Sequence, residues 1–436
     1  MNIAPMRLAL LLIWSVSLAA SDDLPETFLA HLEQARFEQA HALFTESVAG
    51  ALSAEQLAQT WRTLPDQLGE YQGRGAARVE QIQNRPVTVY RLKFAAMALD
   101  ARISQGEDGR IDGFRLVPAA PQPDPFAVAT SADWAEREVT VAGDLPGLLT
   151  VPAGAGVFPG VVLVHGSGPN NRDQTIGPNK PFRDLAHGLA ERGIAVMRFD
   201  KRSYVAPEQF KESPYTVEDE VIGDVLAALE LLRNRPEVNP ARIFVLGHSL
   251  GGYLGPRIAE EDGRLAGLVL LAAPARPLQD IVVEQVTYIS GIDGEVQDAE
   301  TDSIEAFREA ARRAHAADDV ESAEPGMLGL PESYWADLNR YDPRATLKRL
   351  AMPALVVQGG RDYQVTAEDD FRRWREALGD SAETEFAFFQ ELNHLFIEGE
   401  GMATPAEYLG SAGRVSETLI RRVAEWIKQS KSGDTQ

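Results

Sequence analysis

The chain has 436 residues, with 65 Asp and Glu against 42 Lys and Arg, which gives a formal net charge of −23. This charge argues against a nucleic-acid partner, whose phosphates require clustered Lys and Arg, and against anionic membrane surfaces. The sequence contains no cysteine, which excludes disulfides, thiolate metal sites and a lipid-modified N-terminal cysteine. The length is sufficient for one large α/β domain together with a smaller domain.

The first 21 residues have the pattern of a signal peptide. Met1–Arg7 carries positive charge, Leu8–Leu18 is an apolar segment, and Ala19–Ser21 supplies small residues for cleavage. The apolar segment is about half as long as a membrane-spanning helix. We therefore expect residues 1–21 to be removed, and the protein to be exported, periplasmic or secreted, with no stable membrane insertion.

Residues 22–118 indicate a small α+β domain, and residues 119–130 a linker. Apolar residues at helical spacing in Leu24–Leu64 predict two or three helices. Tyr71–Val117 then alternates between apolar and polar residues like antiparallel strands, with a hairpin turn expected at Gly106–Gly109. Four prolines fall within eight residues where this domain meets the linker, which is typical of a stiff spacer.

Residues 131–430 predict an α/β domain with a mostly parallel sheet. Two strands are expected at Glu136–Val141 and Gly147–Val151. Further strands then alternate with helical segments, as in parallel sheets, and are expected near Val161, Ala195, Ile243, Leu268, Ala354 and Glu385. The interval 275–340 inserts extra helices, including Asp302–Ala317. Insertions at the carboxyl edge of such a sheet form lids, so we expect a lid here.

The first candidate site lies in the turn His165–Pro169, directly after the expected strand Gly160–Val164. Glycines in this turn would let a backbone N–H approach a substrate oxygen. A backbone N–H of this turn is therefore the first candidate donor to an oxyanion. The alternative is that His165 and Ser167 only stabilise the turn and have no part in catalysis.

The most informative stretch is Gly247–Gly251, a G-x-S-x-G pattern between the apolar run Ile243–Leu246 and a helical segment. This is the nucleophile-elbow pattern, in which a serine on a sharp strand-to-helix turn exposes its hydroxyl group. Ser249 is therefore the candidate nucleophile, and Leu250, at the start of the helix, is the second candidate N–H donor. The alternative is a serine buried in a glycine-rich turn, which the preceding strand-like run disfavours.

An acidic partner is expected at the end of a later strand. Pro353–Gln358 is a strand candidate, and Asp362 follows it after a glycine-rich turn. There its carboxylate can orient a histidine and hold its tautomer. Asp369 and Asp370 fall on the helix that follows, where carboxylates usually cap the helix or face solvent.

Only two of the seven histidines follow Ser249 in the chain. His394 comes just after the strand-like run Thr384–Phe389, in a loop from which a general base can reach over the carboxyl edge of the sheet. His315 lies in a segment typical of an exposed helix, so His394 is the candidate base. Nucleophile, acid and base then follow in the order that the elbow pattern predicts.

Four blocks of the chain resemble the α/β-hydrolase superfamily, and in particular bacterial EstD-type carboxylesterases, which carry a small domain of unknown function before the hydrolase domain. The blocks begin at Val162 (VLVHGSGPNN), Val245 (VLGHSLGGYL), Gln358 (QGGRDYQVTA) and Leu392 (LNHLFIEGEG). The resemblance implies a catalytic triad of Ser249, Asp362 and His394. It also implies an oxyanion hole built from backbone N–H groups near Ser167 and Leu250, and ester hydrolysis without a cofactor. Because the sequence shows no metal-ligand cluster, we expect no metal site.

These residues predict a two-step acyl transfer on a small-molecule ester, through an acyl-enzyme on Ser249. The inserted segment is about sixty-five residues long, and this size predicts a modest pocket and short to medium acyl groups. A thioesterase or a serine peptidase would use the same triad, and both stay open as alternatives. A non-catalytic binding protein of the cell envelope is a further alternative, which an intact set of Ser249, Asp362 and His394 disfavours.

Overall fold

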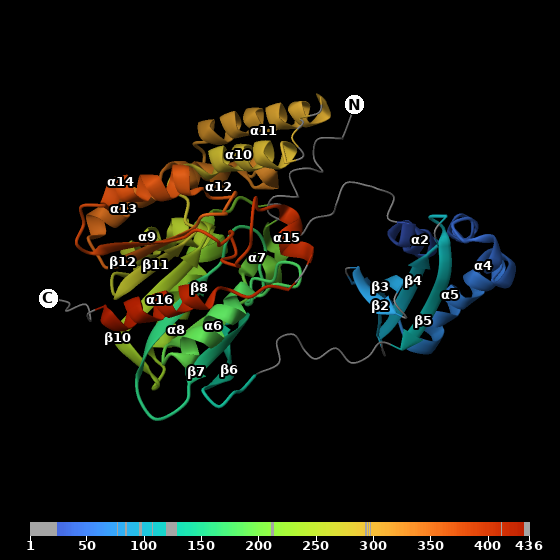
Figure 1. The fold of residues 1–436 in the computed structure, drawn as a ribbon, viewed down its shortest axis with the longest axis horizontal. Coiled ribbons are helices and arrows are strands. Elements are labelled where there is room, and N and C mark those ends of the chain that lie inside the picture. The colour runs from blue at the N-terminus through green and yellow to red at the C-terminus, as the bar shows by residue number, and fades with distance from the viewer. Residues whose placement is uncertain are drawn as a thin grey trace. The chain divides into compact units, whose positions relative to one another are not determined.

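The computed structural model describes residues 24–430 apart from residues 76, 83–84, 96–97, 107, 119–128, 211–212, 293, 295, 297 and 411. The expected signal peptide, and all of the expected linker except residues 129–130, lie outside the described residues. The chain divides into two units at Ala127 and Val128, and each unit is described by itself (Figure 1). No helix in the described part of the chain combines the length and the apolar character of a membrane span.

The smaller unit packs helices against an antiparallel sheet, as its sequence pattern predicted. Its elements are α2 (Leu24–Glu33), α3 (Phe37–His41), α4 (Glu46–Ala51), α5 (Ala54–Leu68), β1 (Tyr71–Arg74), β2 (Arg78–Ile82), β3 (Arg85–Phe94), β4 (Ala98–Gln105) and β5 (Ile111–Pro118). The strand order is β1-β3-β4-β5, with β2 paired to β3, and every pair is antiparallel. Four helices replace the expected two or three, because Ala35, at a φ of 56°, and the short turns after it interrupt the apolar run.

The larger unit is built on an eight-stranded sheet with the order β13-β12-β11-β10-β8-β9-β7-β6. Its strands are β6 (Trp134–Val141), β7 (Leu145–Pro152), β8 (Phe158–Val164), β9 (Ala195–Phe199), β10 (Val238–His248), β11 (Gly267–Leu271), β12 (Ala354–Gly359) and β13 (Thr384–Phe389). Neighbouring strands from β13 to β9 run parallel, whereas β7 pairs antiparallel with both β9 and β6. The predicted α/β class with a mostly parallel sheet is confirmed.

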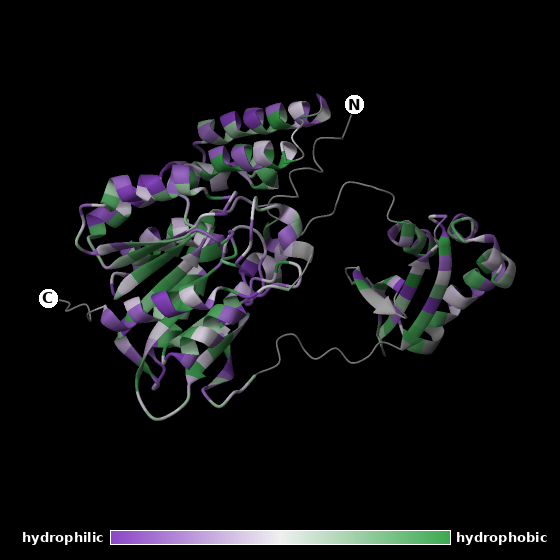
Figure 2. Ribbon diagram, in the orientation of Figure 1, coloured by the Kyte–Doolittle hydropathy of each residue, from purple (hydrophilic) through white to green (hydrophobic). Residues whose placement is uncertain are grey.

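Helices cover both faces of this sheet, which is apolar on both (Figures 1 and 2). α8 (Gly223–Arg233), α9 (Leu250–Asp262), α13 (Pro343–Leu350) and α14 (Arg372–Leu378) lie on one face, with the short helices η2 (Glu218–Ile222) and η4 (Ala367–Phe371), and α6 (Pro181–Glu191) and α16 (Glu417–Gln429) lie on the other. The short helices α7 (Arg202–Val205) and η1 (Pro207–Phe210) bury no residue, and Tyr408 of α15 (Pro405–Gly410) belongs to a separate apolar cluster. Side chains alternate along each strand. Val162 and Val164 of β8 therefore join the core under α8, α9 and α14, whereas Val161 and Leu163 join the core under α6 and α16.

The expected insertion is helical throughout most of its length. It contains α10 (Leu278–Ser290), α11 (Asp298–Ala316), η3 (Met327–Gly329) and α12 (Glu332–Asn339). Its large apolar side chains are buried in the same core as those of α8 and α9, among them Val282, Val286, Phe307, Tyr334 and Trp335. The insertion is thus packed onto the larger unit by its own hydrophobic residues.

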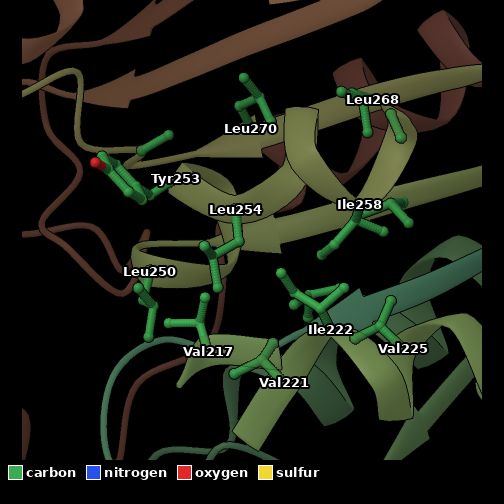
Figure 3. Packing of buried hydrophobic residues seen from close by; sticks show 14 of the residues in the cluster. Val217, Val221, Ile222, Val225, Leu250, Tyr253, Leu254, Ile258, Leu268 and Leu270 are labelled. Carbon is green, nitrogen blue, oxygen red and sulfur yellow. The ribbon is translucent and has the colours of Figure 1, made fainter. Parts of the chain in front are cut away.

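Helix α9 begins immediately after β10, and apolar packing holds it in place (Figure 3). Leu250, Leu254 and Ile258 lie on its side facing η2 and α8, where Val217, Val221, Ile222 and Val225 meet them. Full burial of each such side chain contributes about 1.5–3 kcal/mol. This packing fixes the start of α9, and with it the turn that precedes the helix.

Candidate active site

The four segments singled out in the sequence follow the ends of four parallel strands. β8 ends at Val164, β10 at His248, β12 at Gly359 and β13 at Phe389. Because parallel strands of one sheet have their carboxyl ends at the same edge, the loops after them meet there. The sheet therefore brings together the expected oxyanion turn, nucleophile, acid and base.

Ser249 sits on a strained turn between β10 and α9. Its backbone has φ 54° and ψ −119°, a conformation that costs a residue with a side chain about 1–3 kcal/mol. The turn is tight enough that a Cβ at Gly247 would lie 2.2 Å from the carbonyl oxygen of Gly251. Leu250 is the first residue of α9. These are the properties of a nucleophile elbow.

The hydroxyl group of Ser249 is not used to hold the structure. Serine before a helix usually caps it by accepting a hydrogen bond from a backbone N–H of the first turn, but Ser249 makes no such bond. Its backbone is held instead, since its N–H donates to the carbonyl of Leu271 at 2.9 Å and its carbonyl accepts from the N–H of Tyr253 at 2.9 Å. The half-buried side chain of Ser249, on this fixed backbone, thus has an Oγ atom with no hydrogen-bond partner among the described residues.

Asp362 and His394 form a buried pair. The Nδ1 atom of His394 lies 2.8 Å from Oδ2 of Asp362, and the two residues are 4% and 5% exposed. Oδ1 of Asp362 accepts from the N–H groups of Gln364 and Val365, and Oδ2 also accepts from the side-chain amide of Gln358 at 3.1 Å. With the carboxylate fixed in this way, His394 carries its proton on Nδ1 and leaves Nε2 as a proton acceptor.

The candidate base, His394, lies beside the turn that carries Ser249. The imidazole rings of His394 and His248, the residue before Ser249, have centroids 4.7 Å apart. No hydrogen bond joins Ser249 Oγ to His394 Nε2 within the described residues. Such contacts are often long in ligand-free active sites and shorten in the substrate complex.

The turn after β8 adjoins Ser249 from the other side. A Cβ placed on Gly166 would lie 3.3 Å from the Cβ of Ser249. In the part of the chain that the structure describes, the N–H groups of Ser167 and Leu250 have no hydrogen-bond partner, whereas the N–H of Gly166 donates to Oε1 of Gln174 at 3.0 Å. Ser167 and Leu250 therefore have N–H groups that are available to a substrate oxygen.

Gln174 connects the parts of this site, and sequence reasoning missed it. Its Oε1 accepts from Gly166, so its amide nitrogen is the group 2.7 Å from Nδ1 of His248 and donates to it. His248 then donates from Nε2 to the carbonyl of His394 at 2.8 Å. Burial and the adjacent His394 lower the pKa of His248 to about 3, so this ring stays neutral. One chain of hydrogen bonds links the turn after β8, the elbow and the base.

His315, Asp370 and His165 each pair with groups other than Ser249, Asp362 and His394. His315 lies on α11 and pairs with Asp280 at 2.7 Å, on an exposed part of the helix. Asp370, expected to cap its helix or face solvent, is instead buried, because it accepts from the N–H of Ala275 at 2.9 Å and pairs with Arg276 at 3.1 Å. His165 is buried and holds the turn after β8, with its Nε2 atom 3.1 Å from the carbonyl oxygen of Asn171.

Comparison with known proteins assigns the chain to a family. Residues 161–404 match a model described as the alpha/beta hydrolase family, and residues 26–114 match a protein of unknown function, DUF3887. The chain is 38% identical over 404 residues to Esterase EstD of Thermotoga maritima, which covers 92% of this chain and 93% of that one. The chain belongs to the α/β-hydrolase family. The resemblance stated from the sequence blocks is thus confirmed.

Solved structures similar to this α/β hydrolase include two esterases. Est1E from Butyrivibrio proteoclasticus, with ferulic acid bound, is 14% identical with a TM-score of 0.43, over 67% of this chain and 98% of that one. The Pyrococcus furiosus esterase Pf2001 is 15% identical with a TM-score of 0.42, over 72% of this chain and 96% of that one.

In the described residues of the α/β hydrolase, no three His, Cys, Asp or Glu side chains are grouped so that they could hold a metal ion.

Proposed function

We propose that the protein is a serine carboxylesterase whose nucleophile is Ser249. The observation that carries this proposal is the strained elbow at φ 54°, with a free hydroxyl group, at the same sheet edge as the buried pair of His394 and Asp362. The 38% identity of this chain to Esterase EstD, over nearly the full length of both chains, supports ester hydrolysis as the reaction.

The residues act in a two-step acyl transfer. His394 Nε2 takes the proton from Ser249 Oγ as the oxygen attacks the ester carbonyl carbon. Asp362 keeps the ring oriented and stabilises the imidazolium ion that forms. The N–H groups of Ser167 and Leu250 bind the oxyanion of the tetrahedral intermediate, whose collapse transfers the proton of His394 to the departing alcohol. Water then repeats these steps on the acyl-enzyme and releases the acid.

Four substrates test the reaction class, and three of them share a butyryl group. We expect kcat/KM to be highest for 4-nitrophenyl butyrate, lower for the matching phenyl thioester, and lowest for the butyryl anilide and for alanine 4-nitroanilide. Active sites are counted by labelling Ser249 with a fluorophosphonate, so that inactive protein does not distort the comparison. A higher kcat/KM for the thioester would make the protein a thioesterase, and a higher value for alanine anilide a peptidase. Failure to turn over any of them would indicate a binding protein.

The packing of the insertion supports short to medium acyl chains. Several of its large apolar side chains, such as Val286, Phe307 and Trp335, are buried in the core and are therefore not available to line a long acyl channel. We expect kcat/KM for 4-nitrophenyl esters from C2 to C16 to peak at or below about C8. A maximum at C12 or longer would contradict this expectation.

We also propose that the enzyme is exported. Residues 1–21 have the charge, apolar segment and cleavage site of a signal peptide. We therefore place the mature esterase outside the cytoplasm, in the periplasm or the medium, where it hydrolyses small esters without a cofactor.

A further inference from the structure

Lys201 is a buried cation directly behind the turn that carries Ser167. It follows β9 and is 3% exposed. Its Nζ atom donates to the carbonyl oxygens of Gly168 at 3.1 Å and Gly166 at 3.3 Å, and lies 2.9 Å from a carboxylate oxygen of Glu220. All three N–H bonds of the ammonium group are thereby used, and two of them hold the turn.

The carbonyl of Gly166 and the N–H of Ser167 belong to one peptide group. The described residues contain no cis peptide bond, so these two groups point in opposite directions. Lys201 fixes the oxygen side of this peptide, and Asn170 assists, since its amide nitrogen lies 3.2 Å from the carbonyl oxygen of Gly166. The N–H of Ser167 is therefore directed away from Lys201, and it has no partner of its own in the described residues.

We propose that Lys201 is a positioning residue of the oxyanion hole, which orients and polarises the Ser167 peptide for the tetrahedral intermediate. This inference rests on the esterase function proposed above. A cation on the carbonyl oxygen draws electron density from the peptide and makes its N–H a stronger donor, as in other cooperative hydrogen-bond chains.

The insertion helps to hold this charge in place. Glu220, on η2, accepts from the hydroxyl of Ser203 at 2.8 Å as well as from Lys201. Its other oxygen accepts from the hydroxyl of Tyr334 on α12 at 2.9 Å. Burial and Glu220 raise the pKa of Tyr334 well above its usual range, so it stays a donor. Helix α12 therefore contributes to the buried surroundings of the Lys201–Glu220 pair.

The variant Lys201→Met tests the proposal. We expect kcat for 4-nitrophenyl butyrate to fall about 10- to 100-fold, less than the loss expected for removing an oxyanion donor outright, while KM changes by less than about threefold because the ground state does not use this interaction. The affinity for an alkyl trifluoromethyl ketone, which forms an oxyanion with the serine, should fall in parallel. The affinity for the matching methyl ketone should not. Arg202→Met, which removes the adjacent ion-paired cation, is the control and should keep kcat unchanged.

The results for Ser249→Ala and Lys201→Met distinguish a failure of the proposed esterase function from a failure of the role proposed for Lys201. If Ser249→Ala keeps its activity, the esterase mechanism fails whatever Lys201 does. If Ser249→Ala is inactive and folded Lys201→Met has the kcat and ketone affinity of the wild type, only the role of Lys201 is overturned. A rise in KM at constant kcat would also overturn it. If Lys201→Met does not fold, because Glu220 has lost its counter-charge, the variants Lys201→Met/Glu220→Gln and Asn170→Ser take its place. Their kcat, KM and ketone affinity are measured in the same way.

Discussion

Replacing Ser249 by alanine is expected to lower kcat for an aryl ester by about 10⁴-fold or more and to leave the melting temperature almost unchanged. The loss is large because removal of a triad nucleophile leaves only the catalysis provided by binding and the oxyanion hole. Stability is preserved because the Ser249 hydroxyl forms no capping bond and the backbone bonds to Leu271 and Tyr253 remain. Steady-state kinetics and thermal unfolding of the same preparation measure both effects.

Ser249→Gly is the matched control for the strain at the elbow. Glycine adopts a φ of 54° without the cost that a side chain imposes, so this variant should be inactive and about 1 kcal/mol more stable than the wild type. Residual activity above a few per cent in either variant would place the nucleophile elsewhere. A glycine variant that is less stable than the alanine variant would show that the elbow is not strained.

The sheet and the placement of the site loops could be predicted from the sequence because both depend on local patterns. Apolar runs of strand length alternate with helical segments, and glycines lie at or just beyond the strand ends, at Gly166, Gly247 and Gly359. A parallel sheet then brings such turns to one edge, whatever their separation in the chain. For Asp362 and His394 this reasoning placed the two side chains together, and they are 2.8 Å apart.

The supporting residues could not be predicted because their contacts are long-range and leave no local pattern. Gln174 and His248 are 74 positions apart, and neither lies at a spacing that marks a partner. For Lys201, the charged run Asp200–Arg202 is explained at least as well by a structural salt bridge as by a contact with substrate. The structure shows an ion pair with Glu220 together with bonds to two carbonyls of the turn after β8. The meeting of these side chains depends on how loops pack after the sheet has formed.

Replacing Gly251 by alanine is expected to destabilise the protein by about 3 kcal/mol or more. A Cβ at this position would lie 2.2 Å from the carbonyl oxygen of Val164 and 2.7 Å from that of His165. Both are backbone atoms at the end of β8, which pairs with β10 in the interior of the sheet, so neither side can move cheaply. Overpacking of this kind typically costs 1–3 kcal/mol, and more where the neighbour is rigid. Urea unfolding, with the slope held as a check on two-state behaviour, measures the change.

Gly251→Ala should also lower the activity, and it should do so even for the fraction of the variant that is folded. Any shift that relieves the clash moves either the elbow or the turn after β8, and so changes the distance between Ser249 and the N–H of Ser167. Gly223→Ala is the matched control, because its Cβ would make an ordinary 3.4 Å contact with the carbonyl of Glu218 and alanine favours the helix that begins there by about 0.5–1 kcal/mol. That variant should be as active as the wild type and at least as stable. A Gly251→Ala protein with wild-type stability and kcat would contradict the close approach of α9 to the end of β8, on which the geometry of the elbow depends.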